Sequence, residues 1–329
     1  MRLVHIADTA PGITRKRGGA GFKYVTAAGK PLRDKAALAR IRALVIPPAW
    51  SDVWISPKAN SHLQATGRDA RGRKQYRYHE AFRAHRESHK FARLTAFGAA
   101  LPRIRRRVKS HMARRGLPRE KVIATIVYLL ETTLIRVGNA DYARANHSYG
   151  LTTLRDPHVD VTGSALRFHF KGKSGKEWRL KIENARVARI IKACQDLPGQ
   201  QLFQYQDAQG LRHKVESGDV NNYLRDVAGA DITAKDFRTW AGTVLAGVAL
   251  DGLRAENETE AKRNIRDAIA EVADQLGNTA AICRKCYVHP AILETYSAGT
   301  FALNTNGRPS ASLRKEEAAV LAFLRQHAA

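Results

Sequence analysis

The chain is organised around residues 275–290, which read Gln275-Leu-Gly-Asn278-Thr-Ala-Ala-Ile-Cys-Arg-Lys-Cys-Tyr287-Val-His-Pro290. Apolar residues precede this stretch at helical spacing and predict an amphipathic helix over 258–276. Gly277 suits the end of that helix, where a left-handed residue is needed. Asn278-Thr279 can cap a second short helix, which must end before Pro290. Tyr287 is then expected at the end of a small basic turn, where its phenol either faces a phosphate or packs as a half-buried core residue.

The overall charge points to a polyanionic partner. The 329 residues suffice for about two domains. They include 56 Lys and Arg against 30 Asp and Glu, a net charge of +26, and this excess is spread along the chain rather than gathered in a tail. A field of that sign concentrates polyanions, of which nucleic acid is the commonest.

Three cysteines, Cys194, Cys283 and Cys286, are too few and too uneven for a disulfide framework. They favour a reducing cytoplasm. The first ten residues lack the apolar core of a signal peptide, and no apolar run reaches the length of about 18 residues that a membrane span needs. We therefore expect a soluble intracellular protein without a membrane partner.

The first part of the chain reads as a small β-rich domain over residues 1–82. Residues 1–21 are rich in Gly and Arg and are expected to be loosely ordered until they meet a polyanion. Short strands are predicted at 22–25 and 52–56, with a short helix at 35–44 between them. A hairpin follows, with arms at 62–66 and 74–78 around a turn-forming Arg68-Asp-Ala-Arg-Gly72.

Residues 83–329 read as a larger, mainly helical domain, which makes the fold class α+β. A helical stripe runs from Phe91 to Met112, with Pro102 expected to kink or split it. Further helices are predicted at 122–134, 185–195, 217–229 and 236–250, the last with Thr233 as its cap and Arg238 in its first turn. The clearest strand pair is 166–171 with 177–182, joined by a turn at 172–175.

Several kinds of chemistry lack their motif. Gly172-Lys-Ser174 has no glycine five residues earlier and lies in a hairpin turn, so it is not a phosphate-binding P-loop. Cys283-x-x-Cys286 could be half of a zinc site or a redox pair, but there is no second such motif. Neither a carboxylate cluster for a two-metal nuclease nor a nucleophile elbow for a hydrolase is recognisable.

Metal-free phosphoryl transfer remains open. It needs a nucleophile, cations that balance the charge around phosphorus, and an acid that protonates the leaving oxygen. A tyrosine, two arginines and a lysine can fill these roles, because arginine stays protonated while the pKa of lysine falls beside other cations. Composition alone does not select these four among 56 basic residues and ten tyrosines.

Motifs in sequence order carry a family resemblance. They are Ile46-Pro-Pro-Ala-Trp50, Thr66-Gly-Arg-Asp-Ala-Arg-Gly-Arg-Lys-Gln-Tyr-Arg-Tyr78, Leu130-Glu-Thr-Thr-Leu-Ile-Arg136-Val-Gly-Asn-Ala-Asp-Tyr142, Tyr149-Gly-Leu-Thr-Thr-Leu154, Phe170-Lys-Gly-Lys173, Lys235-Asp-Phe-Arg238-Thr-Trp240, and Leu276-Gly-Asn278 with Lys285-Cys-Tyr287. Together they span about 46–290. In these motifs the chain resembles the type IB DNA topoisomerases, in the compact poxvirus-like form found in bacteria.

The resemblance implies a catalytic set. The nucleophilic tyrosine of the family falls on Tyr287, its two catalytic arginines fall on Arg136 and Arg238, and its hairpin general-acid lysine falls on Lys173. Asn278 occupies the position that is histidine in poxvirus and eukaryotic members. An amide donates a hydrogen bond without bringing a positive charge, so this contact to the phosphate is expected to be weaker.

The resemblance also implies DNA-contacting residues, namely Arg71, Arg73, Gln75, Tyr76, Tyr78 and Tyr142. The implied activity is relaxation of supercoiled duplex DNA through a 3′-phosphotyrosyl intermediate, with no ATP, metal or other cofactor. The expected form is a monomer that closes as a clamp around DNA in the cytoplasm, at the nucleoid.

Two alternatives stay open at this point. A tyrosine recombinase shares the catalytic domain and the phosphotyrosine chemistry. It typically carries His-x-x-Arg at the second arginine, where this chain has Lys235-Asp-Phe-Arg238, and it usually has a helical N-terminal domain. A basic architectural DNA-binding protein would explain the charge but not the aligned set of arginines, lysine and tyrosine.

Overall fold

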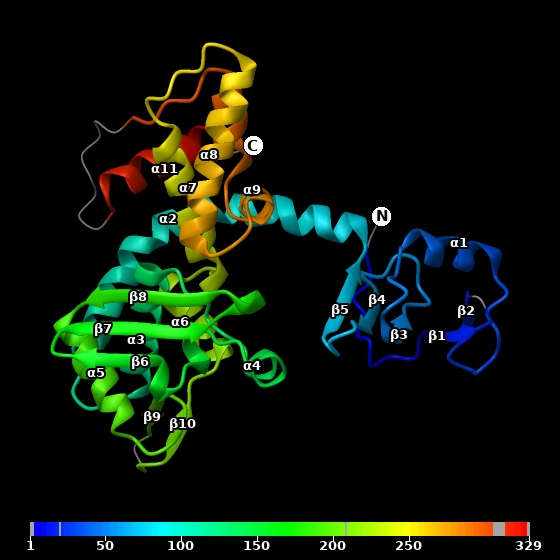
Figure 1. Ribbon diagram of the computed structural model, residues 1–329, viewed down its shortest axis with the longest axis horizontal. Helices are drawn as coiled ribbons and strands as arrows, with labels where there is room; N and C mark the ends of the chain where they lie inside the picture. The colour runs from blue at the N-terminus through cyan, green and yellow to red at the C-terminus, as the bar shows by residue number, and fades with distance from the viewer. Residues whose placement is uncertain (1–2, 20, 208, 305–312, 328–329) are drawn as a thin grey trace. The chain divides into compact units, whose positions relative to one another are not determined.

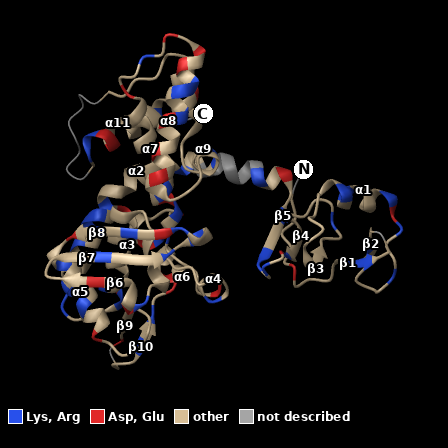
Figure 2. Cartoon of the chain, viewed as in Figure 1, with Lys and Arg blue, Asp and Glu red and all other residues tan. Residues whose placement is uncertain are grey.

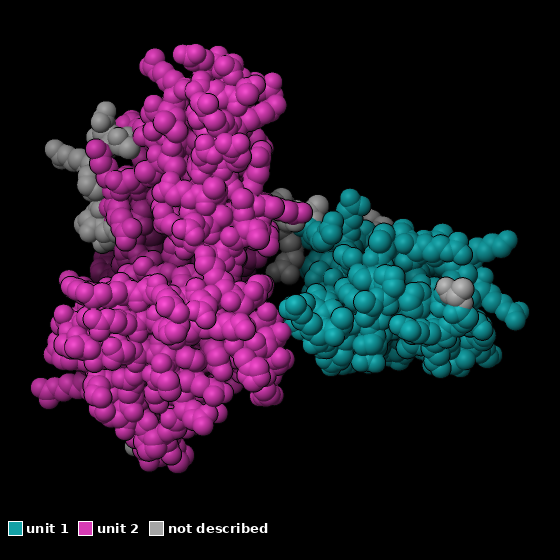
Figure 3. Space-filling view, in the orientation of Figure 1, with its two compact units in different colours: residues 1–90 teal, residues 91–329 magenta. Residues whose placement is uncertain are grey.

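The computed structural model describes residues 3–19, 21–207, 209–304 and 313–327. Contacts between Cα atoms divide the chain into two compact units, Met1–Lys90 and Phe91–Ala329 (Figure 3). This division and the predicted domain boundary after residue 82 both fall inside one long helix, α2 (Glu80–Met112). Each unit has its own apolar core, and each is described by itself below.

Unit 1 is built on a five-stranded antiparallel sheet with the strand order β2-β1-β3-β4-β5 (Figure 1). The strands are β1 (Ile13–Gly18), β2 (Gly21–Val25), β3 (Ser51–Ile55), β4 (Leu63–Arg68) and β5 (Lys74–Tyr78). Helix α1 (Lys35–Ala43) contributes Ile41 to a small core whose other fully buried members are Ile13, Val53, Ile55 and Ala65.

The prediction that residues 1–21 are loosely ordered is wrong for 13–18, which form β1; residues 1, 2 and 20 lie outside the described residues. Only Ile13 of this strand is buried, so its sequence shows no apolar alternation that would predict a strand. Pairing supplies the order instead, because Ile13 lies opposite Ile55 and Thr14 lies opposite both Trp54 and Val25.

Helix α2 runs without interruption from Glu80 to Met112, with Pro102 inside it. Of the two effects predicted for Pro102, the split is therefore wrong, and the kink stays a prediction. Proline removes one backbone hydrogen bond from a helix interior. Here Leu94, Phe97, Leu101 and Ile104 are almost fully buried on both sides of it, and this packing carries the helix through.

Unit 2 is mainly helical. Its helices after α2 are α3 (Arg119–Thr133), α4 (Ala140–Asn146), α5 (Ala185–Gln195), α6 (Ser217–Ala228), α7 (Ala234–Leu250), α8 (Glu258–Leu276), α9 (Ala280–Cys286), α10 (Pro290–Ser297) and α11 (Lys315–Gln326). A three-stranded antiparallel sheet has the order β6-β7-β8, with β6 (Val159–Thr162), β7 (Ala165–Lys171) and β8 (Glu177–Glu183). Leu166, Phe168 and Phe170 of β7 point into the core that α3 and α5 share.

The strand pair predicted at 166–171 and 177–182 is confirmed as β7 and β8. Unit 2 also contains strands that were not predicted. Strand β6 pairs with β7, and β9 (Gln204–Gln206) pairs with β10 (Arg212–Lys214). The sequence pattern did not predict these three strands, because β6 has four residues and β9 and β10 have three each, which is too few for a periodic signal. Helix α7 begins at Ala234, two residues earlier than predicted, so Arg238 lies in its second turn rather than its first.

Residues 275–290 fold as predicted. Helix α8 ends at Leu276, and Gly277 follows in the left-handed conformation with φ of 59°. Thr279 caps α9, its hydroxyl accepting from the backbone N–H of Ile282 at 3.4 Å. Tyr287 is the C-cap of that helix, after a last turn that contains Arg284 and Lys285.

Candidate active site

Tyr287 is fixed through its backbone against helix α7. Its N–H donates to the Cys283 carbonyl at 2.9 Å, and its carbonyl accepts from the Thr243 hydroxyl at 3.3 Å. Gly242 makes this approach possible, because a Cβ there would lie 2.6 Å from the Tyr287 carbonyl oxygen. The side chain is half-buried, and the Arg238 guanidinium carbon lies 5.2 Å from the centre of its ring. The interpretation of Tyr287 as a half-buried residue packed on the core is therefore confirmed, and a cation lies beside its ring. That its phenol faces a phosphate stays a prediction.

Arg238 ties together the ends of two other helices. It is 3% exposed and donates to the carbonyl of Leu134, which follows α3, and at 2.5 Å to the carbonyl of Leu276, the last residue of α8. Burial lowers the pKa of Arg238, the charge of Arg136 lowers it further, and Tyr287 acts in the opposite direction. The guanidinium still stays protonated at neutral pH, because arginine starts from so high a pKa.

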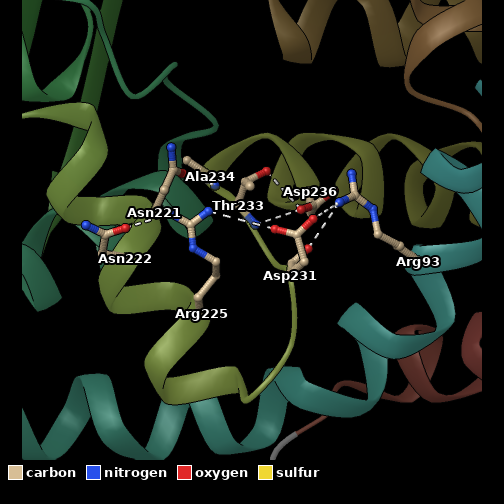
Figure 4. Close-up of polar contacts among 8 residues, drawn as sticks. All are labelled: Arg93, Asn221, Asn222, Arg225, Asp231, Thr233, Ala234 and Asp236. Atoms are coloured by element: carbon tan, nitrogen blue, oxygen red, sulfur yellow. Dashed lines mark hydrogen bonds and ion pairs between the residues drawn. The ribbon is translucent and has the colours of Figure 1, made fainter. Parts of the chain in front are cut away.

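The helix that carries Arg238 is anchored at its first turn (Figure 4). The Thr233 N–H donates to the Asp236 carboxylate at 2.7 Å, and the Ala234 N–H donates to the Asn221 side chain of α6 at 3.0 Å. Asp231, in the turn before α7, accepts from Arg93 of α2 at 2.6 Å and lies 3.8 Å from Arg225 of α6. These contacts hold the start of α7 against both α2 and α6, which fixes where Arg238 emerges.

Arg136 and Asn278 form a pair. Arg136 lies in the loop after α3 and donates to the Asn278 side-chain oxygen and, at 3.4 Å, to the Gly277 carbonyl. The Asn278 side-chain nitrogen is buried and meets no oxygen acceptor within the described part of the chain. Burial raises the pKa of the nearby Cys283 thiol, while Arg238 and a hydrogen bond from the Asn278 side chain oppose that rise. The structure thus brings together four of the five predicted catalytic residues: Arg136, Arg238, Asn278 and Tyr287.

Lys173 is exposed in the turn between β7 and β8. The same hairpin is fastened near Asn278. Lys176 donates to the Asp274 carbonyl at 3.3 Å, and the Trp178 ring packs on Gly277, where a Cβ would lie 3.0 Å from the indole. The turn that carries Lys173 is therefore held at the end of α8, next to the link that carries Asn278.

The predicted DNA-contacting hairpin of unit 1 is organised by Asp69. One oxygen of its carboxylate accepts from the N–H groups of Arg71 and Arg73, both at 3.0 Å. The other oxygen accepts from the Arg73 side chain at 2.8 Å and from the Gln75 amide at 2.9 Å. The hydrogen bond from Arg73 is the main reason that the pKa of Asp69 falls to about 2. Sequence reasoning missed this role, although an Asp two residues before Arg71 is a signal for such a turn.

Aromatic side chains cover the other face of β5. The rings of Tyr76 and Tyr78 stack, with centroids 6.0 Å apart and an angle of 8° between their planes. Tyr76 is 47% exposed, which is unusual for so large a ring. The remaining predicted DNA contact, Tyr142, belongs to unit 2. It lies half-buried in the first turn of α4, and its N–H donates to the Asn139 side chain at 2.8 Å.

Comparison with known proteins decides the family. Residues 79–308 match the family described as eukaryotic DNA topoisomerase I, catalytic core, and residues 21–69 match the bacterial DNA topoisomerase IB N-terminal domain. The chain belongs to the type IB DNA topoisomerases. The α+β fold class agrees with this family, and the enzyme is therefore a DNA topoisomerase rather than the recombinase that shares its chemistry.

Relatives match along most of this topoisomerase. DNA topoisomerase 1B of Acanthamoeba polyphaga mimivirus is 34% identical over 87% of both chains. DNA topoisomerase I of monkeypox virus is 21% identical over 79% of this chain and 82% of its own. DNA topoisomerase 1 of Mycosarcoma maydis is 24% identical over 69% of this chain but only 24% of its own length.

Charge and composition of the described residues are consistent with a DNA substrate. Lys and Arg occur on helices and strands of both units (Figure 2). Within residues 3–19, 21–207, 209–304 and 313–327, no helix is both long and apolar enough to cross a membrane. Over the same ranges, no three His, Cys, Asp or Glu side chains gather as a metal site would require.

Proposed function

We propose that this topoisomerase relaxes supercoiled duplex DNA by transient cleavage of one strand through Tyr287. The observation that supports this most directly is the buried Arg238 beside the Tyr287 ring, together with the Arg136–Asn278 pair around the same helix ends. Cations at that distance favour the phenolate and the extra negative charge of a five-coordinate phosphorus.

In the proposed reaction the Tyr287 oxygen attacks a backbone phosphorus. A bond forms between phosphorus and the phenolic oxygen, whose proton is released to water, while the bond to the 5′-oxygen breaks and Lys173 gives its proton to that leaving oxygen. Arg136, Arg238 and the Asn278 amide stabilise the non-bridging oxygens. The products of the first step are a 3′-phosphotyrosyl bond and a free 5′-hydroxyl.

The energy of the phosphodiester is kept in the phosphotyrosyl bond. The free strand can therefore swivel, after which the 5′-hydroxyl attacks the same phosphorus and releases Tyr287. Each step exchanges one phosphodiester for another, so the reaction consumes neither ATP nor any other energy source. We further propose that one chain closes as a clamp around the duplex, with Arg71, Arg73, Gln75, Tyr76, Tyr78 and Tyr142 as contacts, and that it acts at the nucleoid of the cytoplasm.

Relaxation of supercoiled plasmid in EDTA without ATP tests this proposal. The wild-type chain should relax the plasmid, and stopping the reaction with detergent should leave protein covalently bound to the 3′ side of the nick. The Tyr287→Phe variant should bind DNA, but it should neither relax the plasmid nor become covalently attached to it. A strict requirement for Mg²⁺ or ATP, or an active Tyr287→Phe variant, would refute the mechanism.

A further inference from the structure

A valine in unit 1 occupies a backbone conformation that suits glycine. Val45 follows the C-cap of α1, and its φ is 46°. Its N–H donates to the Arg42 carbonyl at 3.1 Å, as is usual where a helix ends in a left-handed residue. Glycine dominates such positions, and a β-branched residue is the least suited to them, because its two γ carbons crowd the backbone. The chain therefore accepts a conformational cost at this position.

Burial does not offset that cost. Val45 is 72% exposed, the largest exposed fraction among the big apolar side chains of the described residues. Its neighbours Leu44 and Ile46 both pack against the core of unit 1, so the segment does bury apolar side chains where it turns inward. Strain that persists without a packing reward is characteristic of binding and functional sites.

Two arginines fix the loop behind Val45. Arg15 donates to the carbonyls of Ile46 at 3.2 Å, Pro47 at 3.0 Å and Trp50 at 2.7 Å. Arg77 donates to the Val45 carbonyl at 3.1 Å, and its guanidinium carbon lies 5.7 Å from the centre of the Trp50 ring. Four carbonyls of one short loop are thus held by side chains of β1 and β5, and the Val45 side chain is presented from a fixed backbone.

The surroundings of this side chain fit nucleic acid better than protein. Arg42 is exposed one turn earlier on α1, and Arg77 belongs to the strand that also carries Gln75 and Tyr76. A single apolar tip among cations is too small for a protein interface, which needs a contiguous patch. It matches what a DNA groove offers between its phosphates, namely sugar carbons and thymine methyl groups.

We propose that Val45 is an apolar contact to duplex DNA, held out by the strained end of α1. The proposal rests on the function above, in that unit 1 meets the duplex. It goes further by assigning a contact to a residue outside the set of DNA-contacting residues predicted from the sequence. Val45 adds apolar surface to an interface that otherwise consists of cations, an amide and tyrosines.

The test uses Val45→Asn in the non-cleaving Tyr287→Phe background. Asparagine tolerates the left-handed region, so the midpoint of thermal unfolding should rise by about 2–5 °C as the strain is relieved. Affinity for a labelled duplex, measured by fluorescence anisotropy, should fall by about tenfold to a hundredfold, as expected for the loss of one buried valine. The slope of log affinity against log salt should not change, because no phosphate contact is lost.

Matched variants separate this role from others. Val45→Ile keeps the apolar β-branched shape and should keep wild-type affinity and stability. Leu211→Asn removes another exposed apolar side chain, 63% exposed in unit 2, and should leave duplex affinity unchanged. Unchanged affinity of Val45→Asn would overturn the proposal, and so would a fall in its stability or a smaller salt slope.

Failure of this contact and failure of the proposed function remain distinguishable. Anisotropy reports non-covalent binding, so it does not depend on the chemistry at Tyr287. A wild-type chain that binds no duplex would overturn the proposed function and this contact together. Tight wild-type binding that Val45→Asn matches would overturn the contact alone.

Discussion

Replacement of Asn278 tests how the site handles a phosphate oxygen without a histidine. In the protein without DNA, the Asn278 oxygen accepts from Arg136, while its buried nitrogen meets no oxygen acceptor among the residues described and has only the Cys283 thiol, a weak acceptor, beside it. A buried donor without a good partner costs up to about 1–3 kcal/mol, and in the proposed mechanism a phosphate oxygen satisfies it. Asn278→Ala removes that donor, so the DNA-free protein should lose little stability, within about 1 kcal/mol.

The loss should appear in the cleavage step instead. One missing donor to the transition state corresponds to about one to two powers of ten in rate. Arg238→Ala should cost more, because it removes a positive charge as well as the contacts to the Leu134 and Leu276 carbonyls. Single-turnover cleavage of a duplex, with thermal unfolding of each variant as the control, measures both effects.

Two further substitutions sharpen the test. Asn278→Asp keeps the shape and the oxygen that accepts from Arg136, but it replaces the donor with a negative charge beside the phosphate, so it should be slower than Asn278→Ala. Asn278→His should be tolerated, because an imidazole can donate to the same oxygen. If Asn278→Ala and Arg238→Ala abolish cleavage equally, or if Asn278→Asp cleaves at the wild-type rate, the proposed role of the amide is wrong.

Three other predictions concern the general acid Lys173, the backbone of Tyr287 and the buried carboxylate of Glu317. Lys173→Ala should cleave normal DNA about 10²–10⁴-fold more slowly than the wild-type chain. Its cleavage rate should be nearly restored on a substrate with a 5′-bridging phosphorothiolate, because a thiolate leaves without a proton, whereas Lys171→Ala should show no such rescue. The opposite pattern would assign the general acid to Lys171. Gly242→Ala places a methyl group 2.6 Å from the Tyr287 carbonyl and should lower both the cleavage rate and the unfolding midpoint, so a wild-type rate would show that this contact does not position the tyrosine. Glu317, in the first turn of α11, accepts two hydrogen bonds from Arg105 of α2 at 2.7 and 2.8 Å. Burial opposes ionisation of Glu317, yet the hydrogen bonds from Arg105 lower its pKa below the ordinary value. The contribution of Glu317 to stability is therefore present above the ordinary pKa and is lost as pH falls through the lowered one. Glu317→Gln should therefore lower the unfolding midpoint at pH 7 and flatten its decline in acid, and a parallel decline would contradict this.

Local signals explain which parts of the fold could be predicted. Helix α8 shows helical periodicity and a glycine at its end, and the β7–β8 hairpin shows alternation on both sides of a glycine-containing turn. Strand β1 has no such pattern. It pairs with β2 as a local hairpin, and with β3 across about 40 residues, since Thr14 lies opposite Trp54 and Ile13 lies opposite Ile55. Pairing over such distances depends on the assembled sheet, which no sequence window contains.

The site was predictable from resemblance more than from pattern. Periodicity places Tyr287 at a helix end, but it does not select Arg136 and Arg238 among the other arginines. Their positions depend on contacts across the chain, since Arg238 and Leu134 are separated by 104 residues. The sequence did not predict the parts proposed for Asp69 and Val45 for a related reason. The part of Asp69 depends on its hydrogen bonds and that of Val45 on its backbone angle, and residue type alone shows neither.

The geometry around Arg238 explains why the site is assembled from helix ends. The last carbonyls of a helix have no partner within it and carry partial negative charge. Leu134 and Leu276 provide such carbonyls at the ends of α3 and α8, and Arg238 binds both. A guanidinium has five N–H donors, so the bonds to these two carbonyls and to the Tyr287 side chain still leave donors over, among them the buried Nε, which has no partner in the described part of the chain. In the proposed mechanism, one arginine therefore holds the ends of the two helices and still has a donor for a phosphate. A lysine there has three donors on one nitrogen and cannot reach two carbonyls and a phosphate with the same geometry.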